Sequence, residues 1–304
     1  MRAVLVVNPQ ATATSPAGRD VLAYALASEL KLEVVETDYR GHALDAAARA
    51  AFDGADLVVA HGGDGTVNEV VNGLLSGDRR LGAPMLGVVP GGSANVFARA
   101  LGMPRDPIEA THHLLRAVAE GRGRRVALGR AGDRWFTFNA GMGWDADVVA
   151  EVEHKRAKQA SPMLYARKAV SAYLRPPNGR AELTLHLPGR APIEGVRSAF
   201  VSNSDPWSYL GNRPLHLNPT CSLDGGLGLF ALRSLSLPTV LKHLRQSLRS
   251  SAKQRGRRLV RHDDLQNLSI KSKEPVNLQV DGDLLGQRTS VEFSCVRRAL
   301  RVAA

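Results

Sequence analysis

The sequence predicts an α/β domain with a parallel, doubly wound sheet, followed by a mainly antiparallel, β-sandwich-like domain. Apolar strand-like runs alternate with amphipathic helical stretches over about the first 120 residues. A Gly/Arg linker, GRGRR, follows at 121–125, and short strand-like pieces separated by turn residues come after it. We therefore place the domains at 1–122 and 123–304, and the last strand can return to the first domain.

The expected strands of the first domain are residues 2–8, 31–37, 56–61 and 84–90. Residues 2–8 form a continuous apolar run, which is typical of a strand buried on both faces of a parallel sheet. The expected helices follow the strands, because apolar residues there recur at helical spacing. They are residues 18–30, 42–52, 67–75, 93–101 and 106–120.

The second domain is expected to consist mainly of short strands joined by turns. The strand-like pieces are RVALGRA, RWFTFNAG, AELTLHLPG, VRSAFVSN, LGLFALRS, LSIKSKEP, VNLQVDGD and SVEFSCV. Two helical stretches interrupt them, at 161–175 and 238–250. The first opens with Ser-Pro, a favourable pair for the N-cap and the first helical position.

Composition limits the classes of function. The net charge of +11 attracts nucleotides, nucleic acid or anionic lipid, or else serves solubility. Two cysteines without a CxxC spacing argue against a disulfide framework and a zinc site. No apolar run approaches a membrane span, and the N-terminus lacks the features of a signal peptide. We expect a cytoplasmic protein, with association at the inner face of the membrane left open.

The stretch LVVAHGGDGTVNE, at 57–69, predicts a phosphate site at the end of a buried strand. Its glycines can adopt positive φ and let backbone N–H groups approach an anion. The helix that follows adds unpaired N–H groups, and Thr66 can cap it or contact phosphate. An acid in such a loop repels bare phosphate, so Asp64 is expected to face Mg²⁺ or the reacting hydroxyl. The alternative is a tight turn in which Asp64 is an ordinary turn residue.

Two further loops repeat this arrangement. In VVPGGSANVFARALG, at 88–102, a strand ends before two glycines, and Ser93 can cap the next helix. Asn8 and Pro9 end the first strand. Because the carboxyl ends of parallel strands meet at one edge, all three loops should face one crevice. The loops match neither GxxxxGK[ST] nor GxGxxG, which argues against Walker-type and dinucleotide-binding sites.

These motifs together resemble the diacylglycerol kinase catalytic-domain family of lipid kinases. That family includes bacterial lipid kinases and eukaryotic sphingosine and ceramide kinases, and shares a superfamily fold with NAD kinases and phosphofructokinases. The matching segments lie in the family's order along nearly the whole chain. They are NPQATATSPAGRD (8–20), GGDGTVNEVVNGL (62–74), PGGSANVFARALG (90–102), FNAGMGWDADVV (138–149), LDGGLGLF (223–230) and VDGDLLG (280–286).

The resemblance implies that ATP, with Mg²⁺, donates its γ-phosphoryl group to a lipid hydroxyl, in a role in phospholipid biosynthesis. The active site is expected between the two domains. The family's DGE motif supplies the carboxylate proposed as general base, and its counterpart here is Asp283. Asp64 is the second catalytic candidate and the leading Mg²⁺ ligand. The residues implied to border the nucleotide are Asn8, Thr12, Thr37, Gly62, Gly63, Asp64, Gly65, Thr66, Asn68, Glu69 and Ser93.

Two positions depart from the family pattern. Asp283 replaces a glutamate and has a shorter side chain by one methylene. Family members often carry Asp-Asp-Gly-Leu around a structural Mg²⁺, whereas this chain has Asp224-Gly225-Gly226-Leu227. Asp224 is therefore the remaining candidate ligand for that metal.

Several alternatives stay open. Diacylglycerol is the favoured acceptor, but a sphingoid base or another lipid, an NAD kinase-like reaction, and a catalytically weak nucleotide-binding protein are also compatible. Nucleic-acid binding is not expected, because only charge supports it. A homodimer is left open.

Basic stretches at 154–175 and 245–262 fit either an anionic membrane surface or solvent. His61 is expected to be a packed or capping residue. Asn139, Asp145 and Asp147 are expected near the interdomain cleft.

Overall fold

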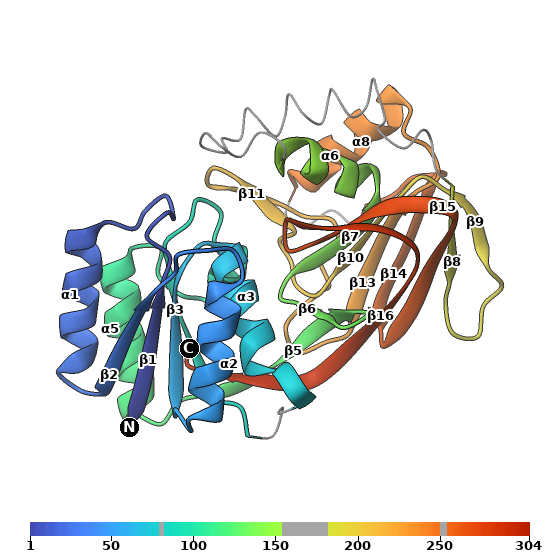
Figure 1. The fold of residues 1–304 in the computed structure, drawn as a ribbon. Helices are drawn as coiled ribbons and strands as arrows, with labels where there is room; N and C mark the ends of the chain where they lie inside the picture. The colour runs from blue at the N-terminus through green and yellow to red at the C-terminus, as the bar shows by residue number, and fades with distance from the viewer. Residues whose placement is uncertain (79–81, 154–181, 250–253) are drawn as a thin grey trace. The chain divides into compact units, whose positions relative to one another are not determined.

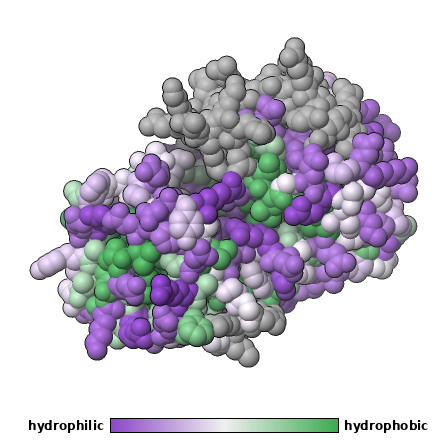
Figure 2. Space-filling model, viewed as in Figure 1, coloured by the Kyte–Doolittle hydropathy of each residue, from purple (hydrophilic) through white to green (hydrophobic). Residues whose placement is uncertain are grey.

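A computed structural model describes residues 1–78, 82–153, 182–249 and 254–304. The chain divides into two compact units (Figure 1). Unit 1 comprises residues 1–127 together with 297–304, and unit 2 comprises residues 128–296. Hydrophilic residues cover most of the face shown in Figure 2, and hydrophobic residues gather in only a few places on it.

Unit 1 is an α/β layer structure around a parallel sheet in the order β4-β3-β1-β2. The strands are β1 (Arg2–Val7), β2 (Lys31–Glu36), β3 (Leu57–Gly62) and β4 (Met85–Pro90). The helices are α1 (Pro16–Ala27), α2 (His42–Phe52), α3 (Asp64–Leu74), α4 (Val96–Ala100) and α5 (Pro107–Ala119), with a short 3₁₀ helix at Ser76–Asp78. Helix α1 packs with α5 and α2 packs with α3, on opposite faces of the sheet (Figure 1).

Local sequence explains where the helices of unit 1 begin and how closely they pack. Ser15 caps α1 by accepting a hydrogen bond from Gly18 N, and Asp106 caps α5 through Ile108 N and Glu109 N. Proline follows each cap, where its missing N–H costs nothing. A Cβ on Gly73 would lie 2.2 Å from Leu44 O, so α3 needs a glycine to approach α2.

Unit 2 is built on an antiparallel sheet in the order β14-β13-β10-β7-β15-β16. The strands are β5 (Arg124–Ala131), β6 (Arg134–Phe136), β7 (Asn139–Gly143), β8 (Leu183–His186), β9 (Ile193–Val196), β10 (Ser198–Ser202), β11 (Ser208–Leu210), β12 (Arg213–Leu215), β13 (Leu227–Leu232), β14 (Leu259–Leu265), β15 (Asn267–Val280) and β16 (Asp283–Val302). The helices are α6 (Trp144–Glu153) and α8 (Leu237–Ser247). Strands β5 and β16 each have one end in unit 1.

Alternate residues of these strands build the core of unit 2. Met142, Leu229, Ile270 and Phe293 are fully or almost fully buried in one apolar cluster. The last residues of the chain belong instead to unit 1, where Val302 pairs with Leu86 of β4.

The predicted fold class is confirmed for both parts of the chain. Two details differ from expectation. The helix expected at 93–101 is shorter, Val96–Ala100, because Asn95 adopts a left-handed conformation just before it. The pieces LSIKSKEP and VNLQVDGD form one strand, β15, whose pairing is irregular between Lys271 and Val276. Pro275 lies in that interval and has no N–H to donate. The predicted helix at 161–175 lies outside the described residues.

Candidate active site

The two glycine loops of unit 1 lie directly against each other at the carboxyl ends of β3 and β4. Gly91 N donates a hydrogen bond to Gly62 O at 2.8 Å. A Cβ on Gly92 would lie 2.6 Å from Gly63 Cα, and a Cβ on Gly91 would lie 3.0 Å from Gly62 Cα. The glycines are therefore required because two backbones share this space.

Backbone conformation gives a correction. The positive φ expected for the glycines at 62, 63 and 65 is not observed, so that expectation was wrong. Gly62, Gly63, Gly91 and Gly92 all lie outside the left-handed region, and Gly63 has φ −84° and ψ −178°. Glycine is required in these loops because the two backbones approach closely, and not because of unusual dihedral angles.

Asn8 joins the end of β1 to both neighbouring elements. Its backbone N–H bonds His61 O at 3.0 Å, and its side-chain Nδ2 donates to Thr66 Oγ1 at 3.0 Å. Its Oδ1 accepts from Gln10 N at 2.9 Å and so shapes the turn that follows. Thr66 does not cap α3, because the N-cap position belongs to Gly63. The hydroxyl of Thr66 instead anchors Asn8.

The turn after Asn8 covers the second glycine loop. Ala13 N donates to Gly91 O at 2.8 Å, and Thr14 Oγ1 lies 3.5 Å from the Nε2 of buried His61. Burial lowers the pKa of His61, which fits the expected packing role. The side chains of Thr12 and Ser93 are exposed on the two loops.

Ser93 does not cap α4, because Asn95 occupies the N-cap position with φ 49°. Asn95 holds the glycine turn closed instead. Its Oδ1 accepts from Gly92 N at 2.9 Å, and its Nδ2 donates to Gly92 O at 2.6 Å. Sequence reasoning missed this residue, although asparagine is among the few that tolerate the left-handed region.

Asp64 is the first residue of α3, and its half-buried carboxylate reaches the second loop. Asp64 Oδ1 accepts a hydrogen bond from Phe97 N at 3.2 Å. Phe97 lies in the first turn of α4, whose N–H groups have no partner within the helix. The acid in the GGDG motif therefore links the two glycine loops, a role that the sequence analysis did not assign.

The remaining predicted residues of unit 1 lie around the loops rather than in them. Glu69 Oε1 accepts from Gly41 N at 2.9 Å and fixes the connection before α2. Asn68 is fully buried and accepts from Asn72 Nδ2. Thr37 follows β2, and its N–H bonds Val7 O at 2.9 Å.

In unit 2, the turn between β15 and β16 carries the predicted base. Val280 pairs with Asp283, so the turn consists of Asp281 and Gly282. Both have positive φ, 47° and 84°, as a type I′ hairpin requires. Asp283 is the first residue of β16 and is half-buried. Its backbone position is therefore fixed by a tight turn.

Asp281 anchors this turn from inside the unit. Its buried carboxylate accepts hydrogen bonds from Thr137 N and Thr137 Oγ1, both at 2.7 Å. It also accepts from Phe138 N and Asn139 N, both at 3.0 Å. Burial raises the pKa of Asp281, and the four hydrogen bonds act in the opposite direction. The Asp-Gly hairpin signal was present in the sequence, but its anchoring role was missed.

A second buried polar cluster lies beside this turn, within unit 2. Gln279 Nε2 donates to Asn139 Oδ1 at 2.7 Å and to Asp145 Oδ2 at 2.6 Å. Asn277 Nδ2 donates to Asp147 Oδ1 at 2.7 Å. Burial raises the pKa of Asp145 to about 7, against the effect of Gln279. The structure thus brings together the three polar residues predicted from NAGMGWDAD, with Gln279 and Asn277 as partners.

The loop that carries Asp224 does not fit a metal site. Asp224 is exposed, and the second acid of the family pattern is Gly225. Gly225 O accepts from Cys295 Sγ at 3.3 Å, and Gly226 O lies 3.6 Å from Cys221 Sγ. Mg²⁺ binds through oxygen ligands, but here thiols already donate to the backbone oxygens of the loop.

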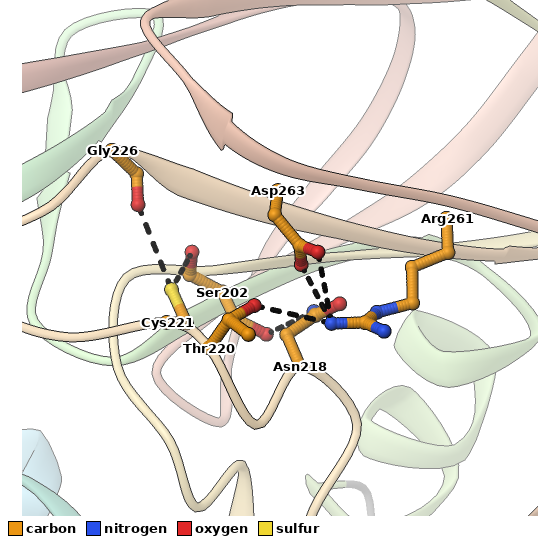
Figure 3. A network of polar contacts seen from close by, with 7 residues as sticks. All are labelled: Ser202, Asn218, Thr220, Cys221, Gly226, Arg261 and Asp263. Carbon is orange, nitrogen blue, oxygen red and sulfur yellow. Dashed lines mark hydrogen bonds and ion pairs between the residues drawn. The ribbon is translucent and has the colours of Figure 1, made fainter. Parts of the chain in front are cut away.

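The positive charge nearest this loop comes from the protein itself (Figure 3). Arg261 Nη2 bonds both carboxylate oxygens of Asp263, at 2.8 and 3.0 Å, and Thr220 Oγ1 at 3.1 Å. The amide N–H of Gly226 bonds Asp264 Oδ1 at 2.8 Å. Burial raises the pKa of Cys221 to about 12, so its thiol remains a donor. These side-chain contacts surround the loop in which Asp224 was the candidate metal ligand.

The rest of the described chain offers few candidate metal ligands in groups. Over residues 1–78, 82–153, 182–249 and 254–304, no three His, Cys, Asp or Glu side chains gather as a metal site. The carboxylate at the glycine loops is Asp64. A single carboxylate fits Mg²⁺ that is held mainly by phosphate oxygens and water.

The motifs of unit 1 match a model of a known protein family. Residues 2–131 match the model of the diacylglycerol kinase catalytic domain. The match includes both glycine loops, Asn8 and Asp64.

Relatives extend the similarity along the chain. A diacylglycerol kinase of Bacillus subtilis is 36% identical over 178 residues, which cover 56% of this chain and 54% of that protein. The chain thus aligns with about half of that relative's length. A diacylglycerol kinase of Staphylococcus aureus is 29% identical over 268 residues, which cover 88% of this chain and 80% of that protein. Both relatives are described as diacylglycerol kinases.

Solved structures show the same fold. A diacylglycerol kinase from Bacillus anthracis aligns with a TM-score of 0.73 at 19% identity, over 99% of this chain and 96% of that one. An NAD kinase from Archaeoglobus fulgidus, solved with ATP, aligns with a TM-score of 0.55 at 13% identity, over 100% and 94%. Within the described part of the chain, no helix has the length and hydropathy needed to span a membrane.

Proposed function

We propose that this protein is an ATP-dependent lipid kinase that transfers the γ-phosphoryl group to a hydroxyl of diacylglycerol. The interlocked glycine loops at the start of α3 carry this proposal. They present backbone N–H groups at a helix N-terminus, and such N–H groups bind phosphate well. The match of these residues to the diacylglycerol kinase catalytic domain supports the substrate class.

The nucleotide is assigned to the carboxyl edge of the sheet in unit 1. The exposed hydroxyls of Thr12 and Ser93 are available for its phosphates. Asn8 and Thr66 hold the first strand and α3 together and so keep the N–H groups in place. Asn68 and Glu69 support the surrounding connections, and the half-buried Thr37 after β2 stays a candidate for nucleotide contact.

Asp64 would hold Mg²⁺ next to these phosphates, and Mg²⁺ would supply charge neutralisation for the transferred group. The observation that supports this role is the position of the carboxylate. Asp64 Oδ1 is fixed by Phe97 N, and the carboxylate lies where the two glycine loops meet. Fixed oxygen donors of this kind suit a hard cation.

Asp283 would act as the general base. Its carboxylate would take the proton of the lipid hydroxyl as that oxygen forms a bond to the γ-phosphorus. The bond from the γ-phosphorus to the β–γ bridging oxygen breaks, and ADP leaves with that electron pair. The turn anchored by Asp281 supports this assignment, because a base must be held in position to be effective.

Labelled ATP and Mg²⁺, offered with dioctanoylglycerol, sphingosine or NAD, test the proposed reaction. We expect label in phosphatidic acid, identified by mass spectrometry. Label only in phosphorylated sphingosine or NAD would replace the proposed substrate. ATP binding without any labelled product would leave a nucleotide-binding protein and overturn the kinase proposal.

The variant Asp283→Asn tests the base. We expect turnover to fall by roughly 10²–10⁴-fold while ATP affinity stays unchanged, because only proton transfer is affected. Stopped assays and calorimetric ATP titration measure the two quantities. Unchanged turnover would remove Asp283 from the mechanism.

A further inference from the structure

Helix α8 presents its leucines outward and buries two polar side chains. Leu237, Leu241 and Leu244 are 54%, 53% and 51% exposed, and Leu248, at the end of the helix, is 44% exposed. The side chains that α8 buries are His243 and Ser247. A helix at the surface of a protein normally has the opposite orientation.

Specific contacts fix α8 in this orientation. His243 Nδ1 bonds Gln254 Oε1 at 3.0 Å, and its ring packs edge-on against Phe230, with centroids 5.5 Å apart. Ser247 O accepts from His216 N at 2.7 Å. Gln254 Nε2 donates to His216 O at 3.0 Å. Rotating the helix to bury its leucines would leave these buried polar groups without partners.

The exposed leucines form a single narrow stripe. At 3.6 residues per turn, the four side chains fall within an arc of about 60°. Lys242, Arg245 and Arg249 lie along one flank of this arc, and all three are exposed. The helix is thus amphipathic toward solvent.

The surrounding sequence is uniformly basic. Residues 225–262 contain no Asp or Glu. The Lys and Arg residues in this segment are Arg233, Lys242, Arg245, Arg249, Lys253, Arg255, Arg257, Arg258 and Arg261. Arg261 is paired with Asp263, so the positive charge beside the leucines comes from the exposed Lys242, Arg245 and Arg249. An apolar stripe flanked by positive charge complements an anionic bilayer, which offers acyl chains below negative headgroups.

We propose that α8 docks the protein onto an anionic membrane surface. The leucines enter the boundary between headgroups and acyl chains, and Lys242, Arg245 and Arg249 pair with lipid phosphates. The biological purpose of this docking rests on the proposed lipid-kinase function, because a diacylglycerol substrate resides in a bilayer. The physical evidence for it comes from α8 alone.

Co-sedimentation with sucrose-loaded vesicles tests the docking. The full chain is mixed with phosphatidylcholine vesicles with or without phosphatidylglycerol. We expect the wild type to sediment with the anionic vesicles, and Leu241→Gln/Leu244→Gln to lower the vesicle partition coefficient by roughly tenfold or more. The matched control is Val21→Gln/Tyr24→Gln, an exposed apolar pair with the same spacing on α1, which should bind as the wild type does.

The charge contribution needs its own comparison. Arg245→Gln/Arg249→Gln should weaken binding to anionic vesicles, whereas Arg49→Gln/Arg116→Gln, exposed arginines of α2 and α5, should not. Wild-type protein that does not sediment, or leucine variants that sediment like the wild type, would overturn the proposal. Loss of a dimer in light scattering without any change in vesicle binding would assign the stripe to a second copy of the chain, and so also overturn it.

Short-chain dihexanoylglycerol separates the docking from the catalytic proposal. Its phosphorylation in free solution should be the same in the wild type and the leucine variant, while phosphorylation of vesicle-borne diacylglycerol falls with binding. If neither lipid is phosphorylated, the proposed function fails, and the sedimentation result still stands or falls by itself. Equal loss on both substrates would show that the leucines act on the catalytic unit rather than on docking.

Discussion

At the scale of single residues, Gly92 shows how the candidate site is built. Its missing Cβ leaves room for Gly63, and the amide of Gly92 is held by Asn95. The N–H groups offered to phosphate depend on this close backbone contact. The N–H groups proposed to bind phosphate therefore depend on other residues, such as Gly92 and Asn95, that give the loops their shape.

Gly92→Ala should disrupt the loops. The new methyl group would meet Gly63 Cα, a backbone atom that cannot move away without shifting α3, so we expect a loss of about 1–3 kcal/mol and much weaker ATP binding. Thermal melting and calorimetric titration measure both effects. Gly82→Ala is the control, since nothing lies within 4 Å of the added Cβ there. Equal behaviour of the two variants would show that the loops do not interlock in solution.

Asp145 should make the stability of unit 2 depend on pH. Its folded-state pKa, about 7, is raised above the unfolded value of 3.8 by burial. Between these values the folded state binds the proton and the unfolded state does not. The contribution of Asp145 to the free energy of unfolding is therefore greatest below about pH 4. It is lost as pH rises toward 7, at up to about 1.4 kcal/mol per pH unit.

Denaturant unfolding at several pH values, compared with Asp145→Asn, isolates this contribution. The variant should lose the falling slope between about pH 4 and 7, while other titrations cancel in the difference. Parallel curves for the two proteins would contradict the buried, protonated state of Asp145.

At the scale of elements, side-chain contacts hold the loop 220–226 in place. Arg261, whose side chain is 12% exposed, bonds Asp263 and Thr220, and two thiols bond the loop's carbonyls. A chelator removes a bound metal ion but cannot remove the guanidinium group of Arg261. The stability of this loop should thus be independent of free divalent cations.

Arg261→Met should lower the melting temperature, because it removes the hydrogen bonds from Arg261 to Asp263 and Thr220, at a cost of about 0.5–1.5 kcal/mol. EDTA should not shift the melting temperature of the wild-type protein. Arg49→Met, which removes an exposed arginine of α2, serves as the control. A marked fall in melting temperature with EDTA would restore a structural metal to this loop.

Periodicity predicted the elements better than their orientation. The strand bounds expected for unit 1 agree with the structure within a residue or two. Strands β1, β3 and β4 are almost fully buried and have a clear apolar signature, whereas β2 is mostly exposed. The leucines of α8 predicted a helix, but periodicity identifies a face without saying which way it points. Contacts distant in sequence, such as His243 with Gln254 and Phe230, decide that.

The candidate site was only partly predictable for the same reason. The motifs located the glycine loops, Asn8 and Asp64. The contacts from Asp64 to Phe97 and from Asp281 to Thr137 depend on the fold, and spacing in the sequence does not reveal them. Side chains that hold the site in place were accordingly missed more often than the loops themselves.

At the scale of the whole molecule, the end of β16 completes the sheet of unit 1. Leu300 and Val302 are fully buried, Val302 pairs with Leu86, and Ala303 N bonds Leu86 O at 2.9 Å. Unit 1 therefore depends on residues at both ends of the sequence.

Leu300→Ala/Val302→Ala should destabilise unit 1 by several kcal/mol, since each removes fully buried methyl groups; single large-to-small changes of this kind cost about 1–5 kcal/mol. Hydrogen exchange followed by mass spectrometry should show faster exchange in β4, with unit 2 less affected. Arg301→Ala, an exposed residue between them, is the control. Unchanged protection of β4 would show that the terminal residues do not support the sheet.

This arrangement has a consequence for biosynthesis. The ribosome makes residues 1–127 first, but residues 297–304 follow only after about 170 intervening residues. At translation rates of about 5–20 residues per second, the nascent N-terminal unit waits on the order of ten to thirty seconds for its last strand. Its sheet edge at β4 stays open during that time and is exposed to chaperones. ATP-binding competence is thus expected only after residues 297–304 have joined the sheet of unit 1.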